Sequence, residues 1–191
     1  MLKEIRLFNP NNQSVLGIFA RCMMVVISAV WLFYLDEIED ADPVVSTLVL
    51  MILSFSKTFY FVWVGYQKII DVTIKDAPFH KFIIFASMNI LVFILSFTFD
   101  FFGLYLIDPS NYDGMPLNFS KPRILFEFLF FSLQQFTFFG YGSLLPSSIL
   151  AKILSMLELT ISFLTVLFIL SDFNSLKESL LSKVEPQKEE K

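Results

Sequence analysis

Long apolar stretches alternate with short polar connections along most of this chain. Four of them reach the length of about 20 residues that a helix needs to cross a hydrocarbon core about 30 Å thick. These four stretches are residues 14–35, 44–66, 82–107 and 147–171. A fifth stretch, 124–139, is shorter and is followed at once by Gly140, Tyr141 and Gly142. A helix of that length enters a membrane without crossing it, so the pattern predicts four membrane-spanning helices, one re-entrant helix and a loop.

The composition agrees with a membrane protein and excludes several other classes. Hydrophobic residues make up 55% of the 191 residues, charged residues make up 17%, and 25 residues are Phe. A soluble domain of this size could not bury so much apolar surface. A net charge of −4 gives no basis for nucleic-acid binding, and one Cys and one His give no basis for a metal cluster. We therefore expect an all-α integral membrane protein, surrounded by lipid, that is not an enzyme and needs no cofactor.

The basic residues predict how the chain lies across the membrane. They lie before the first span, in the connection between the second and third spans, and after the last span. The connection 36–43, in contrast, carries only acidic charges. Positive charges accumulate on the cytoplasmic side, so both termini are expected in the cytoplasm of a multi-pass cell-membrane protein. The re-entrant loop then opens to the outside, although Lys121 and Arg123 lie on that side and run against the rule.

The most specific pattern is the run 130–146, which reads FFSLQQFTFFGYGSLLP. It resembles the pore loop of the potassium-channel superfamily in its small two-helix form. In that family an aromatic pair and a Ser lie in the pore helix, Gly-Tyr-Gly ends the filter, and a Pro follows. The resemblance covers about 82–172 and none of the first two spans. It implies a tetramer in which each chain supplies a quarter of the carbonyl rings that replace the hydration shell of potassium.

The resemblance assigns roles to three groups of residues. The selectivity filter is expected at Thr137, Phe138, Phe139, Gly140, Tyr141 and Gly142, with potassium held by the backbone carbonyls of Phe139, Gly140 and Tyr141. Support from the pore helix is expected from Phe130, Phe131, Ser132, Gln134 and Gln135. The inner cavity is expected at Ser162, Phe163, Val166 and Leu170. The last three share one helical face by their spacing, which is also typical of residues that face lipid or a neighbouring helix.

Elementary stereochemistry supports a filter at this place. Carbonyls that all point at one axis need backbone dihedrals that change sign, and Gly140 and Gly142 adopt positive φ without steric cost. The preceding helix would point its negative end at the membrane centre, which favours a cation there.

The filter departs from the family pattern at two positions. Phe138 and Phe139 stand where the family has Thr and Val, so the hydroxyl of the innermost ion site is missing and four Phe138 rings would narrow the pore. Two functions therefore stay open. The chain is either a subunit of a channel that passes potassium passively, or a non-conducting or non-selective subunit that assembles with related channel subunits or regulates them.

Two charged residues, Lys57 and Glu158, fall near the membrane centre when depth is counted along their helices at about 1.5 Å per residue. Charges at that depth are costly and are normally paired. We therefore predict an ion pair between them; the alternative is that Lys57 extends towards the interface and Glu158 is protonated. Along the chain, we expect an N-terminal two-helix region at 1–81, a pore domain at 82–172 and a short charged tail at 173–191.

Overall fold

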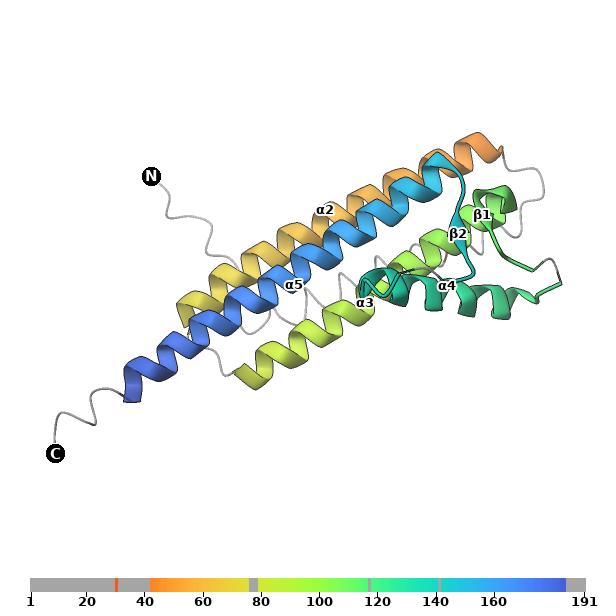
Figure 1. Ribbon diagram of the computed structural model, residues 1–191. Coiled ribbons are helices and arrows are strands. Elements are labelled where there is room, and N and C mark those ends of the chain that lie inside the picture. The colour runs from red at the N-terminus through yellow and green to blue at the C-terminus, as the bar shows by residue number, and fades with distance from the viewer. Residues whose placement is uncertain (1–29, 31–41, 76–78, 117, 141, 185–191) are drawn as a thin grey trace, which may run out of the picture.

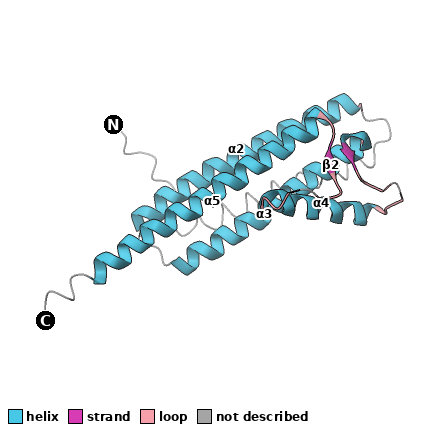
Figure 2. Cartoon of the chain, viewed as in Figure 1, coloured by secondary structure: helices cyan, strands magenta, loops and turns pink. Residues whose placement is uncertain are grey.

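The computed structural model describes residues 30, 42–75, 79–116, 118–140 and 142–184, and of these it describes 64–75, 79–85 and 171–184 by their backbone alone. The described chain is mostly helical (Figure 1, Figure 2). Its helices are α2 (Pro43–Lys75), α3 (Phe79–Ile107), α4 (Lys121–Phe136) and α5 (Ile149–Val184). A 3₁₀ turn, η1 (Pro109–Asn111), and two short strands, β1 (Tyr112–Asp113) and β2 (Leu145–Pro146), complete it.

Three of the described helices are long and apolar enough to cross a membrane. The candidate spans are Pro43–Trp63 in α2, Ala86–Ile107 in α3 and Ile149–Leu170 in α5. The prediction of an all-α, multi-pass membrane protein is confirmed to that extent. The first predicted span, 14–35, lies outside the described residues apart from Val30. Helix α5 continues past residue 172 to Val184, so much of the predicted tail is helical.

The three long helices pack against one another. Helices α2 and α5 lie side by side, and α3 contacts both of them (Figure 1). Helix α4 is about half as long as the others and packs mainly on α3, with further contacts to α5. Helix α2 belongs to the predicted N-terminal region, yet it packs directly on the two long helices of the predicted pore domain.

The segment between α3 and α5 leaves the helices and returns to them at the same end. Beyond α3, β1 pairs antiparallel with β2, the strand that immediately precedes α5, and Tyr112 lies opposite Pro146. Ser147, just after β2, is hydrogen-bonded to η1. Its amide donates to the Asn111 carbonyl at 2.9 Å and its hydroxyl donates to the Ser110 carbonyl at 2.6 Å. Helix α4 and its loop therefore form an excursion that starts and finishes at this two-stranded ribbon.

Close approach of backbone makes Gly114 necessary beside this ribbon. Its φ is +89°, and a Cβ there would collide with the Ser143 carbonyl.

Asp108 begins the turn before β1, since its carboxylate accepts a hydrogen bond from the Ser110 amide at 2.9 Å. Hydrogen bonds from the side chain and amide of Ser110 lower the pKa of Asp108.

Aromatic rings fasten α4 to α3 and to the ribbon. The Tyr112 and Phe128 ring centroids lie 4.9 Å apart, and those of Phe101 and Phe131 lie 5.0 Å apart, both in edge-to-face geometry. Such pairs contribute about 0.5–1.5 kcal/mol each beyond the area that they bury. Burial raises the pKa of the Tyr112 phenol well above its usual range. The core therefore lies where α3, α4 and β1 meet.

Candidate functional site

Helix α4 ends in a Schellman motif with Phe in the position that usually holds glycine. The Phe139 amide donates to the Gln134 carbonyl at 3.0 Å, and the Phe138 amide donates to the Gln135 carbonyl at 3.2 Å. Phe138 has φ +55°, so a bulky side chain occupies the left-handed region. The hydroxyl of Thr137 donates back to the Leu133 carbonyl at 2.8 Å. The residue type of Phe138 does not indicate this conformation.

The backbone after the motif has positive φ at alternate residues. Gly140 has φ +74°, two residues after Phe138, and a Cβ on it would meet no atom within 4 Å. The expected positive φ is therefore present at Gly140 but absent at Gly142, and Phe138 adopts it instead. Tyr141 lies outside the described residues.

The predicted support residues divide between two environments. Phe131 and Ser132 are buried, whereas Phe130 is 48% exposed, so the aromatic pair splits between the core and the surface. Gln134 lies directly behind the loop, because a Cβ on Gly142 would come within 2.6 Å of its Oε1 atom. Gln135 is half-buried and borders a cavity.

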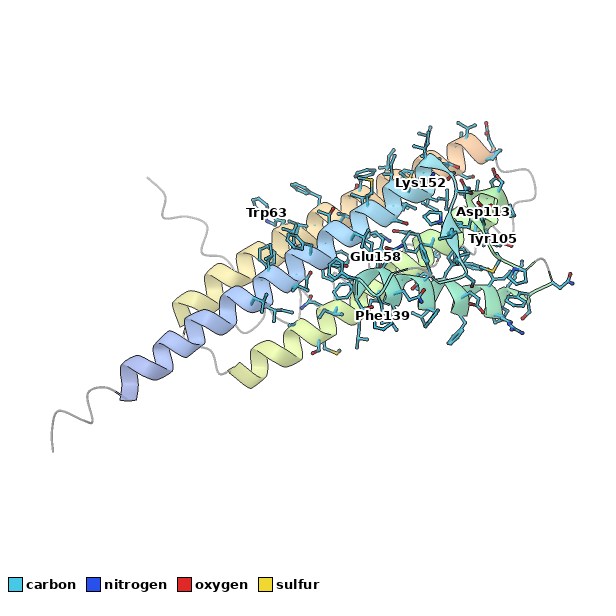
Figure 3. All side chains as sticks on the ribbon, in the orientation of Figure 1. Trp63, Tyr105, Asp113, Phe139, Lys152 and Glu158 are labelled. Carbon is cyan, nitrogen blue, oxygen red and sulfur yellow. The ribbon has the colours of Figure 1, made fainter. Side chains whose placement is uncertain are left out.

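That cavity has a volume of about 470 Å³ and lies between the end of α4, the loop and α5. The lining is mostly apolar, with glutamine, lysine and serine side chains among it. The lining residues are Phe131, Gln134, Gln135, Phe138, Gly140, Gly142, Leu144, Leu145, Pro146, Lys152, Ser155, Met156 and Leu159. Phe139 is absent from this lining and is 88% exposed, at the end of α4 (Figure 3).

The residues predicted to line an inner cavity do not share one face of α5. Phe163, Val166 and Leu170 are exposed, in agreement with their common helical face. Ser162 is fully buried, and its hydroxyl donates to the Glu158 carbonyl one turn earlier, at 2.8 Å. The side chain of Ser162 points into the protein, so its predicted place in an inner cavity is wrong, and the roles of the other three residues stay predictions.

Two further polar contacts lie buried between the helices, and the first corrects a prediction. Lys57 on α2 forms an ion pair with Asp100 on α3, with Nζ and Oδ1 2.5 Å apart, and not with Glu158. The Lys57 ammonium also donates to the Ser96 carbonyl at 3.1 Å, and the Ser54 hydroxyl donates to the other carboxylate oxygen of Asp100 at 2.7 Å. Lys57 and Asp100 thus satisfy each other inside the protein.

The error in the predicted pair has a geometric cause. If the outer ends of α2 and α3 were level, Asp100 would lie about 10 Å above Lys57 at 1.5 Å per residue. Because Ser54 and Lys57 both contact Asp100, α2 must start farther out than α3 ends. The acid at the depth of Lys57 is therefore Asp100, whose position in an apolar run was the available signal.

Glu158 takes part in the second contact. Its Oε1 atom lies 2.5 Å from the Ser132 hydroxyl of α4, and that hydroxyl lies 3.0 Å from the Ile94 carbonyl of α3. Glu158 is fully buried, and Figure 3 shows it on the side of α5 that faces the other helices. Ser132 was predicted as pore-helix support, and it connects three helices at one point.

Comparison of the chain with protein-family models, curated proteins and solved structures found no match.

Proposed function

We propose that the chain is one subunit of a tetrameric channel that passes cations, potassium above all, through the loop 137–142. The observation that carries this proposal is the excursion between α3 and α5. Ser132, near the carboxyl end of α4, contacts Ile94, which lies about 20 Å from the end of α3 at 1.5 Å per residue. The loop after α4 then returns to the two-stranded ribbon, where the excursion began. A helix that enters a bilayer and returns as irregular backbone has this form.

The loop backbone supports the same proposal. In a strand, successive carbonyls point to opposite sides, whereas φ of alternating sign turns them towards one side. Positive φ at Phe138 and Gly140 has that alternation. Four such loops around one axis would supply rings of carbonyl oxygens for a dehydrated cation. The carboxyl end of α4, with its partial negative charge, points to the inner end of that axis.

Flux through purified protein tests the proposal. In liposomes, the wild type is expected to release potassium faster than sodium. Gly140→Ala should abolish most of the flux, because alanine at φ +74° is strained although space for its Cβ exists. Ser143→Ala, at an exposed position just beyond the loop, is the matched control and should conduct normally. Flux that is absent from the wild type, or equal in all three proteins, would count against a conducting pore here.

A second function is favoured by Phe138 alone. Its ring is 50% exposed, stands at the inner end of the loop and replaces the hydroxyl that the resembled family has there. Four such rings would obstruct a pore, and the tetramer would then serve as a non-conducting partner of related subunits. Potassium flux from Phe138→Gly but not from the wild type would support this second function.

A further inference from the structure

The Ser132 hydroxyl has two hydrogen-bond contacts but only one proton to donate. Its hydroxyl oxygen lies within hydrogen-bond distance of Glu158 Oε1, at 2.5 Å, and of the Ile94 carbonyl, at 3.0 Å. Both neighbours are acceptors when Glu158 is ionised, yet a serine hydroxyl has only one proton to donate. One of the two contacts would then bring two acceptor oxygens together without a hydrogen.

A protonated Glu158 removes the imbalance. Its Oε1–H donates to Ser132 Oγ, and the Ser132 hydroxyl donates in turn to the Ile94 carbonyl. The two hydrogen bonds then form a continuous chain from α5 through α4 to α3.

The second carboxyl oxygen of Glu158, Oε2, is independent evidence that this acid is protonated. Glu158 Oε2 is buried and has no hydrogen-bond partner among the described residues. A bare carboxylate oxygen in that position carries the cost of an unsolvated charge, whereas the carbonyl oxygen of a neutral acid costs far less. The charges of Lys57 and Asp100 oppose each other at 2.5 Å, so among the described residues a neutral Glu158 also leaves these three buried side chains without net charge.

We infer that Glu158 is a neutral carboxylic acid in this conformation and acts as a positioning residue, holding α4 and its loop in place by the hydrogen-bond chain through Ser132 to Ile94. Loss of its proton turns the Ser132 hydroxyl towards Glu158, breaks the bond to α3 and leaves a buried charge, so alkaline conditions disfavour this position of α4. The inference rests on the proposed function only where the loop of α4 is taken as the filter.

Within the described part of the chain, the titratable groups around Glu158 come from three other elements. They are Lys57 on α2, Asp100 on α3 and the Tyr112 phenol on β1, whose charges all interact with that of Glu158. Tyr112 stays neutral through the neutral range, because burial raises its pKa well above that of an ordinary tyrosine. Asp100 is the one other buried acid of this group, so the experiment must separate it from Glu158.

Infrared spectroscopy of the full-length protein reads the proton directly. A protonated carboxylic acid has a carbonyl stretch at higher frequency than an ionised carboxylate, and the wild type should have this band near neutral pH. Glu158→Gln should lose the band, whereas Asp100→Asn should keep it. A band that disappears in Asp100→Asn and persists in Glu158→Gln, or no band in the wild type, would overturn the inference.

The pH profile of thermal stability tests the positioning role. The melting temperature of the wild type should fall from neutral to alkaline pH as Glu158 loses its proton. Glu158→Gln keeps an N–H donor for Ser132, so it should stay stable and show a flatter profile; Ser132→Ala should be less stable at all pH values. Glu127→Gln, a half-buried acid elsewhere on α4, is the control and should retain the wild-type profile. Identical profiles for wild type and Glu158→Gln would refute the role.

Neither measurement needs ion conduction. If the protein passes no potassium but the band and the profile behave as expected, the proposed function fails and the inference about Glu158 stands. If potassium flux is present and the band is missing, the proposed function stands and the inference about Glu158 fails.

Discussion

At the scale of single residues, Phe138 has an unfavourable backbone conformation. It is the one non-glycine residue in the described chain with positive φ, and it occupies the C′ position of a Schellman motif, where glycine is usual. The left-handed region costs an L-residue about 1–2 kcal/mol. Such strain at a loop proposed to bind ions agrees with the tendency of unusual backbone to gather at functional sites.

Replacing Phe138 with glycine should therefore stabilise the protein. Phe138→Gly is expected to raise the free energy of unfolding by about 1 kcal/mol, because the half-exposed ring loses little burial while the strain disappears. Denaturant unfolding in detergent measures this. Phe139→Gly is the control; its residue lacks positive φ, so glycine there should be neutral or destabilising. Equal stabilisation by both substitutions would show that strain at Phe138 is not the cause.

Threonine is the residue that the resembled channel family has at this position, and it would restore a hydroxyl to the proposed filter. The structure argues against that choice. Threonine is β-branched and tolerates positive φ less well than phenylalanine, so Phe138→Thr should lower stability even if it widens the pore. Glycine removes the ring and the strain together.

At the scale of helices, buried polar contacts fix how α2, α3, α4 and α5 sit against one another. Lys57 and Asp100 join α2 to α3, and Glu158 and Ser132 join α5 to α4. Apolar packing alone specifies the register of membrane helices weakly, because lipid tails are as apolar as the side chains. These contacts therefore fix the axial register between helices whose contact surfaces are otherwise mostly apolar.

A double-mutant cycle should reveal this register. Lys57→Met alone leaves the buried Asp100 carboxylate without its cation, and Asp100→Asn alone takes the carboxylate away from Lys57. Each is expected to cost about 3–5 kcal/mol, whereas the double substitution should cost clearly less than the sum. Thermal or denaturant unfolding of the four proteins gives the coupling energy. The cycle of Lys57→Met with Glu158→Gln is the comparison and should show weaker coupling. Stronger coupling to Glu158 would contradict the observed ion pair.

At the scale of the whole molecule, hydropathy and glycine spacing predicted more than charge did. Apolar length predicted four spans, and the three that fall in the described residues are candidate spans in the structure; a short apolar run before Gly140 was enough to predict α4 and a loop. The partner of Lys57 and the direction of Ser162 could not be predicted, because both depend on the axial offset and rotation of packed helices. Positive φ at Phe138 is imposed by the motif that ends α4, which residue type does not indicate.

The proposed tetramer should bury the ring of Phe139. In the single chain this side chain is 88% exposed, although it stands at the loop that four copies would bring together around one axis. An aromatic ring buried against a neighbour contributes about 1.5–3 kcal/mol. Phe139→Ala should therefore raise the dissociation constant of the tetramer by tenfold or more, since about 1.4 kcal/mol corresponds to tenfold.

Native mass measurement in detergent, across a range of protein concentrations, checks the assembly. The wild type is expected as a complex of four chains, and Phe139→Ala should dissociate at a higher concentration. Phe126→Ala removes a ring that is 63% exposed on α4, away from the loop, and should leave the tetramer intact because the four copies are proposed to meet at the loop. A wild type found only as monomers or dimers would rule out the fourfold ring of carbonyls. Equal loss of tetramer in both variants would mean that the loop is not where the four copies meet.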